Sequence, residues 1–209
     1  MSTWKEQAKH EITAVGRGII QNLELREAKR TQEKMAILSV SAQSGLTQTQ
    51  IDRFCTTLLA TTSDPLAIFL HIISQTSAFS EMHLAGPEWI HETLHLPEPM
   101  TFCFSPATPF PENICEIETQ FLKQVETLNK ETLLIVPECG AGFWPIALAP
   151  YVKKAIGLEK NPYALLDAKE NVNTHPSKNV FFKSKTLEEF LDSREGREYN
   201  REKSNLVIL

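Results

Sequence analysis

The chain has 209 residues, of which 42% are hydrophobic and 22% charged, and its formal net charge is −5. This composition is typical of a globular protein with one large or two small domains. No apolar run approaches the roughly 20 residues of a membrane span, and the amino terminus lacks the apolar core of a signal peptide. We therefore expect no membrane association and a cytoplasmic location.

The charge is spread unevenly along the chain. Residues 81–138 contain ten Glu and only two Lys, and the remainder is close to neutral. This distribution predicts no strong polyphosphate-binding surface. The four cysteines are scattered without a CxxC pair, and the histidines lack convincing ligand spacing, so we expect no metal site.

Residues 1–104 contain short apolar segments typical of strands and one amphipathic segment typical of a helix. Strands are expected at 19–25, 35–40, 66–73, 88–94 and 101–104. The helix is expected at 48–60, with Thr47 as its N-cap. The segment 26–34 is a charged, hairpin-like connection.

The basic side chains of that connection are open to two interpretations. They could contact RNA phosphates, or they could simply belong to a solvated hairpin, which is the more frequent case. The residues concerned are Arg26, Lys29, Arg30 and Lys34.

The second half alternates between strand and helix patterns after a Pro-rich junction at 105–113. A helix is expected first, at 114–128. Strands are then expected at 132–136, 154–158, 179–183 and 205–209. Helices are expected at 144–151, 163–173 and 187–192. This alternation predicts a parallel, doubly wound sheet. The charge-dense segment 194–204 is expected to be a mobile loop.

A nucleotide-binding pattern lies at the start of this alternation. The strand at 132–136 leads into Cys139-Gly140-Ala141-Gly142, and Glu159 follows the next strand about 20 residues later. Glycines allow the backbone to approach a ligand closely, and a carboxylate at this distance can accept hydrogen bonds from ribose hydroxyls. The alternative is a plain tight turn between strand and helix.

Several further segments show a resemblance to the RNA (uracil-C5) methyltransferases. Residues 22–38 resemble the family's "RNLvIREg…TGEvMvvL" segment, 104–113 its "iSPxxFFQvN" junction, and 139–142 its "DLYCGxG" turn. Residues 157–171 resemble "GvExxpxAvxdAkeNa", and 205–209 resemble the strand that precedes "DPPR". The resemblance implies an α/β fold: a small mixed domain at 12–104 and an incomplete Rossmann-like class I methyltransferase domain at 105–209.

The chain also departs from the family pattern. Val136, Pro111 and Thr186 stand where relatives carry an aspartate, a glutamine and a second acid. The "DPPR" loop and the cysteine nucleophile of the family fall beyond Leu209. By this resemblance the chain matches a middle section of the family, truncated at both ends.

The resemblance implies that S-adenosylmethionine is the cofactor, with binding weakened by the three departures. The candidate cofactor-binding residues are Cys139, Gly140, Gly142, Glu159 and Asn113. The alternative role of Asn113 is to cap the helix that begins at this residue. Phe143 and Trp144 could border the adenosine, although packing on the sheet is the commoner role.

No residue is assigned a catalytic role. The family's chemistry needs a cysteine that adds to C6 of uracil, and no cysteine of this chain falls on that position. We therefore expect a uracil of ribosomal or transfer RNA as the family substrate, but no methylation by the chain alone. A second polypeptide could complete the domain. The alternative function is a non-catalytic scaffold that binds RNA or a protein.

Overall fold

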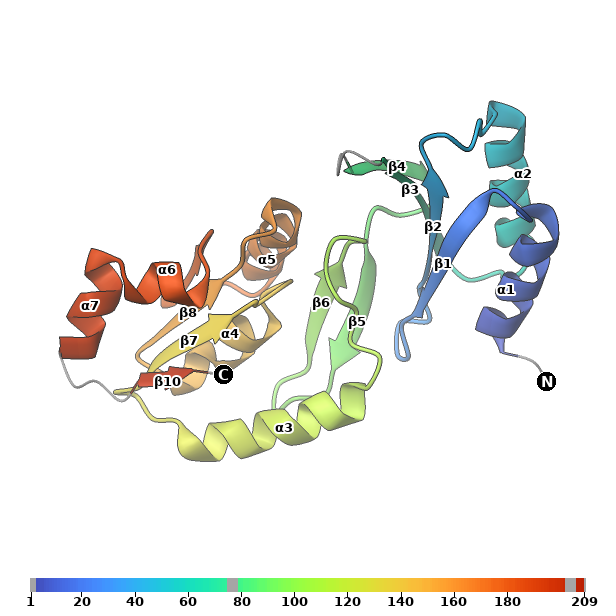
Figure 1. The fold of residues 1–209 in the computed structure, drawn as a ribbon. Helices are drawn as coiled ribbons and strands as arrows, with labels where there is room; N and C mark the ends of the chain where they lie inside the picture. Colours follow the sequence, from blue (N-terminus) through green and yellow to red (C-terminus); the bar gives the residue numbers. More distant parts are fainter. Residues whose placement is uncertain (1–2, 75–78, 202–205, 209) are drawn as a thin grey trace. The chain divides into compact units, whose positions relative to one another are not determined.

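We describe the fold from a computed structural model, in which residues 3–74, 79–201 and 206–208 are described. The chain forms two compact units, Met1–Ile90 and His91–Leu209. Their boundary falls at the first residue of strand β5 (Ile90–Leu94), whereas the sequence placed the division after residue 104. Figure 1 shows the helices and strands of both units.

The first unit is a four-stranded sheet with two helices on one face. The strand order is β1-β2-β3-β4, with only the central β2–β3 pair parallel. The elements are α1 (Trp4–Val15), β1 (Ile20–Glu27), β2 (Lys34–Ser41), α2 (Gln48–Leu59), β3 (Leu66–Ile73) and β4 (Phe79–Ala85). Helix α2 makes the crossover that a parallel pair requires.

The core of the first unit lies between the two helices and the sheet. Ala8 and Ile12 of α1, together with Phe54 and Leu58 of α2, pack on buried side chains of β2 and β3. Both helices begin with a capping box, Thr3 with Glu6 and Thr47 with Gln50, which satisfies free backbone N–H groups of the first turn. The predicted helix at 48–60 and the predicted strands of this unit are confirmed, whereas α1 and β4 were not predicted.

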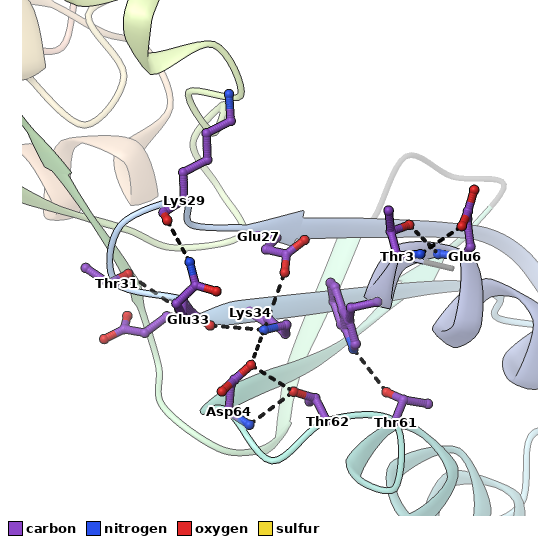
Figure 2. Close-up of polar contacts among 12 residues, drawn as sticks. Thr3, Glu6, Glu27, Lys29, Thr31, Glu33, Lys34, Thr61, Thr62 and Asp64 are labelled. Atoms are coloured by element: carbon purple, nitrogen blue, oxygen red, sulfur yellow. Dashed lines mark hydrogen bonds and ion pairs between the residues drawn. The ribbon is translucent and has the colours of Figure 1, made fainter. Parts of the chain in front are cut away.

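The basic connection between β1 and β2 is less exposed than the solvated-hairpin interpretation requires. Lys34 is 2% exposed and bonds to Asp64 at 2.5 Å and to the carbonyl of Gln32 at 3.2 Å. Glu27 lies 3.4 Å from the same ammonium group (Figure 2). The interpretation is therefore wrong for Lys34, because its charge is satisfied inside the unit and does not face solvent.

The second unit contains a two-stranded ribbon and a parallel sheet. The ribbon comprises β5 and β6 (Met100–Phe104), and helix α3 (Ile114–Thr127) follows it. The parallel sheet has the order β10-β7-β8-β9. Its strands are β7 (Leu133–Pro137), β8 (Lys154–Leu158), β9 (Val180–Lys183) and β10 (Leu206–Ile208). Its helices are α4 (Phe143–Leu148), the 3-10 turn η1 (Ala149–Tyr151), α5 (Pro162–Thr174), α6 (Leu187–Leu191) and α7 (Arg194–Arg201).

The predicted alternation of strands and helices is confirmed, apart from the segment that follows α6. A mobile loop was expected at 194–204, but residues 194–201 form helix α7, and 202–205 lie outside the described residues. The ring of Tyr199 stacks on Phe190, which is itself buried against β7 and β8. The ammonium group of Lys154 lies 5.0 Å from the centre of the Tyr199 ring and donates a hydrogen bond to its hydroxyl. The prediction of a loop was wrong because it was based only on the high charge density of this segment. The ring of Tyr199 packs on Phe190 in spite of the surrounding charges.

Candidate cofactor site

The turn after β7 has the backbone that the glycine pattern predicts. Gly140 and Gly142 have φ values of 51° and 79°, in the left-handed region that glycine tolerates best. A Cβ added at Gly142 would lie 2.7 Å from the Phe182 ring. Gly142 is also the N-cap of α4, and its carbonyl accepts a hydrogen bond from the Ile146 N–H at 3.1 Å. A side chain at position 142 would therefore meet both backbone strain and a steric clash.

Glu159 and the glycine turn lie together at the carboxyl ends of β7 and β8. One carboxylate oxygen of Glu159 accepts a hydrogen bond from the Gly140 N–H at 3.1 Å, and the other accepts one from the Asn161 N–H at 2.8 Å. An ionised carboxylate has about four acceptor positions, so two remain for a ligand. The structure thus brings together two residues that are 19 positions apart in the sequence.

A cavity of about 620 Å³ opens beside this contact. Its volume is in the range of small-molecule and cofactor sites. The lining residues come from the ends of β7, β8 and β9 and from the junction after β6. They are Ala107, Pro109, Pro137, Glu138, Leu158, Glu159, Lys160, Asn161, Ala164, Lys185, Thr186, Leu187 and Glu188. In parallel α/β sheets, ligands bind at this carboxyl end.

Two buried polar residues of α5 organise the walls of this site. Asp167 accepts hydrogen bonds from the backbone and hydroxyl of Ser105, at 2.9 and 2.7 Å, and from the Thr108 hydroxyl at 2.8 Å. Asn171 donates to the carbonyls of Cys103 and Ala141 and accepts from the Cys103 N–H. One helix therefore holds both the junction loop and the glycine turn.

These two residues were missed as site residues at the level of sequence. Asp167 and Asn171 are four positions apart and so share one face of α5. That spacing was the available signal, but the partners are distant in the sequence: Ser105 lies 62 residues from Asp167, and Cys103 of β6 lies 68 residues from Asn171. Nothing local in the sequence names those partners.

Two other predicted cofactor residues, Cys139 and Asn113, do not line the cavity. Cys139 is buried, its N–H donates to the Leu158 carbonyl at 3.0 Å, and it does not line the cavity. Asn113 caps α3, and its side chain bonds to Glu116, so the structure gives it the capping role. Phe143 packs edge-on against Phe102, with ring centres 5.3 Å apart, which favours the packing interpretation for this side chain.

The two buried cysteines of this unit are poor nucleophiles. Burial raises the pKa of the Cys139 thiol to about 12, with a further contribution from the charge of Glu159. Burial likewise raises the pKa of Cys103 to about 12, assisted by Asp167 and Glu170. Because the thiolate is the reactive form, both thiols are inert near neutral pH.

The positions that depart from the family pattern have defined structural roles. Val136 is buried in β7 and pairs with Gly157 of β8. Thr186 lines the cavity, but its hydroxyl caps α6 by accepting a hydrogen bond from the Glu189 N–H at 3.2 Å. Val136 and Thr186 thus both serve the fold.

Two classes of site are not found in the part of the chain that the structure describes. No three His, Cys, Asp or Glu side chains gather there as metal ligands. Among the same residues, no helix has both the length and the apolar character needed to cross a membrane.

The fold of the chain has a counterpart among solved methyltransferase structures. The second unit has the Rossmann-like fold of the class I methyltransferases. The crystal structure of the Pyrococcus abyssi tRNA (uracil-54, C5)-methyltransferase in complex with S-adenosyl-L-homocysteine matches this chain with a TM-score of 0.67 at 20% identity. The match covers 97% of this chain and 55% of that protein. The predicted α/β fold, with a small mixed unit ahead of the Rossmann-like one, is therefore confirmed.

Sequence relatives specify the likeness further, although no protein-family model matches the chain. An uncharacterized RNA methyltransferase of Protochlamydia amoebophila is 32% identical over 206 residues, which is 90% of this chain and 46% of that protein. The human tRNA (uracil-5-)-methyltransferase homolog A is 33% identical over 102 residues, covering 48% of this chain and 16% of that protein. The resemblance to RNA (uracil-C5) methyltransferases is thus confirmed. The chain spans less than half the length of these two relatives.

Proposed function

We propose that this chain binds S-adenosylmethionine in the 620 Å³ cavity as the cofactor-binding part of an RNA (uracil-C5) methyltransferase of the cytoplasm. The observation that carries the proposal is the contact between Glu159 and the Gly140 N–H at the carboxyl end of the sheet. The sequence relatives named as RNA methyltransferases support it, and a uracil of transfer or ribosomal RNA is the substrate class that follows.

The residues around the cavity suit the proposed cofactor. Glu159 is held by two backbone N–H groups and keeps acceptor positions for the two ribose hydroxyls. The side chains of Pro109, Leu158 and Leu187 provide apolar walls for a purine ring. When bound, the cofactor supplies an electrophilic methyl group; the part of this chain is to bind and orient it.

The chemistry at uracil is a separate requirement. Attack on C6 needs a thiolate, and no cysteine lines the cavity. Cys103 and Cys139 are buried with raised pKa values, and the exposed Cys115 lies on α3. We therefore expect the attacking thiol to come from outside these 209 residues, either from a second polypeptide or from a longer form of this one.

Calorimetric titration with S-adenosylhomocysteine tests the cofactor proposal. We expect saturable binding to the purified chain and a loss of about tenfold or more in affinity for Glu159→Ala, because a charged hydrogen-bond acceptor is removed. Glu126→Ala is the matched control, since this exposed residue of α3 lies outside the cavity lining. Absence of heat at millimolar ligand would instead favour a scaffold that binds RNA or a protein without a cofactor.

A transfer assay tests the expected lack of catalysis. Radiolabelled S-adenosylmethionine and RNA are incubated with the purified chain, and we expect no label in the RNA. Incorporation of label that disappears in Gly142→Asp would show that the chain methylates RNA by itself.

A further inference from the structure

Glu138 has an unusual backbone for a residue with a long side chain. It lies between β7 and the glycine turn, lines the cavity, and has a φ of 50°. Residues other than glycine, asparagine and aspartate rarely adopt this left-handed conformation, and those that do gather at functional sites. A glycine would hold the turn with less strain. The glutamate therefore costs stability at a position where the cavity gains a carboxylate.

The carboxylates that line the cavity differ in how far their oxygen atoms are engaged. Glu159 accepts two backbone hydrogen bonds. Hydrogen bonds from its own backbone N–H and from Thr186 lower the pKa of Glu188. Within the described residues, Glu138 has neither a hydrogen bond nor an ion pair. Glu138 is thus the lining carboxylate whose acceptor positions all remain for a ligand.

The strand order indicates which part of a ligand would meet Glu138. Glu159 follows β8, which lies between β7 and β9 in the sheet. A nucleoside whose ribose rests on Glu159 has its two ends over the neighbouring strands, each about 4.8 Å away. The end over β9 meets Thr186 and Leu187, and the end over β7 meets Glu138. S-adenosylmethionine carries a cationic ammonium group at its amino-acid end and an uncharged purine at the other.

We propose that the carboxylate of Glu138 binds the α-ammonium group at the amino-acid end of S-adenosylmethionine. The proposal rests on the proposed function and adds to it a residue that determines ligand specificity. The site then binds nucleosides that carry an amino-acid chain, such as S-adenosylmethionine, more tightly than nucleosides that lack the ammonium group.

A pair of ligands separates this role from a general effect on the cavity. S-adenosylhomocysteine carries the ammonium group, and 5′-methylthioadenosine lacks the whole amino-acid end. Titration of Glu138→Gln should show S-adenosylhomocysteine binding about tenfold more weakly, the effect of one charged hydrogen bond, with methylthioadenosine binding unchanged. Glu126→Gln, at an exposed position of α3 outside the cavity lining, is the matched control, and it should leave both affinities as in the unmodified chain.

Glu138→Gly provides a second test that does not depend on one substitution. It should weaken S-adenosylhomocysteine binding like Glu138→Gln and raise the melting temperature by about 2–4 °C, because glycine relieves the left-handed strain. Equal weakening of both ligands, or of neither, in Glu138→Gln would overturn the proposal and leave the cofactor site standing. Failure of the unmodified chain to bind either ligand would overturn both.

Discussion

Each of the two units contains a buried polar centre, and the two centres serve different ends. In the first unit, Lys34 is surrounded by Asp64, Glu27 and the carbonyl of Gln32, which satisfy its charge. In the second, Asp167 and Asn171 bind backbone and hydroxyl groups of the loops that border a 620 Å³ cavity. Burial of polar groups therefore does not by itself mark a functional site. What matters is whether the groups that they hold belong to a cavity wall.

The largest expected effect is that of Asp167→Ala. It removes the common acceptor of three hydrogen bonds, from the Ser105 N–H, the Ser105 hydroxyl and the Thr108 hydroxyl, and each lost buried hydrogen-bond partner costs about 1–3 kcal/mol. Allowing for water that enters from the cavity, we expect the free energy of unfolding to fall by about 3 kcal/mol. S-adenosylhomocysteine affinity should fall as well, because the junction loop loses its anchor.

Chemical denaturation and calorimetric titration of the same protein measure the two effects of this change. Asp167→Asn is the matched control, since an amide keeps the volume and one acceptor oxygen, and it should lose less of both quantities. A variant that loses stability but retains full ligand affinity would show that the α5 centre, like Lys34, serves only the fold.

Lys34→Met should weaken the first unit while sparing the ligand site. The methionine keeps the apolar contacts of the side chain, but the charged hydrogen bonds are lost, so we expect a fall of about 1.5 kcal/mol in the free energy of unfolding. S-adenosylhomocysteine affinity should remain unchanged. A clear loss of affinity would contradict the division of roles between the two centres.

The same variant should respond differently to acid. Hydrogen bonding to Lys34 lowers the pKa of Asp64 below its ordinary value of 3.8 in the folded state. A lowered folded-state pKa contributes stability above the unfolded value, and this contribution is lost as the pH falls through the folded value. The difference in stability between the unmodified chain and Lys34→Met should therefore be constant near neutral pH and should narrow below about pH 4.

A smaller effect is expected for Tyr199→Phe on α7. The Tyr199 hydroxyl accepts a hydrogen bond from Lys154 and donates one to Glu195 at 3.3 Å, while the ring packs on Phe190. Removing the hydroxyl alone should cost about 1 kcal/mol and accelerate amide hydrogen exchange across 194–201. Exchange as slow as in the unmodified chain would show that ring packing is sufficient to hold α7.

The smallest effect on stability is expected for Thr186→Asp. Aspartate caps a helix about as well as threonine, so the free energy of unfolding should change by less than about 0.5 kcal/mol. The new carboxylate adds an acceptor to the β9 side of the cavity. We expect S-adenosylhomocysteine affinity to rise roughly threefold to tenfold, the effect of one added hydrogen bond. Thr186→Ser is the matched control and should leave affinity unaltered.

The regular part of the fold could be predicted from the sequence because its signals are local. Short apolar runs that alternate with helix patterns predicted β7 and β8, and a threonine N-cap predicted the start of α2. Helix α1 escaped notice although Thr3 and Glu6 form a capping box, which is itself a local signal. Helix α7 also has a local signal, since the Ser193 hydroxyl accepts a hydrogen bond from the Gly196 N–H at 3.2 Å, but the contact between Tyr199 and Phe190 depends on the fold.

The residues of the candidate site also differ in whether a local sequence signal indicates their role. Spacing from the glycine turn predicted Glu159, and its contact with Gly140 agrees with that pattern. The roles of Asp167 and Asn171 could not be predicted, because they depend on partners brought close by the fold. Glu138 was passed over because a left-handed φ at a glutamate has no signature in the amino-acid sequence.

The pairing of β7 has a consequence for how the second unit is assembled. Leu133 pairs with Lys154 on one side and with Leu206 on the other, so one neighbour is near in the chain and the other is far away. Contacts between distant segments form late, because closing a long loop costs entropy before the contact compensates for it. On the ribosome, β7 and β8 can associate as soon as both have emerged, whereas the outer edge of β7 stays open until residues 206–208 appear. Chaperones that recognise unpaired strands would have their opportunity during that interval.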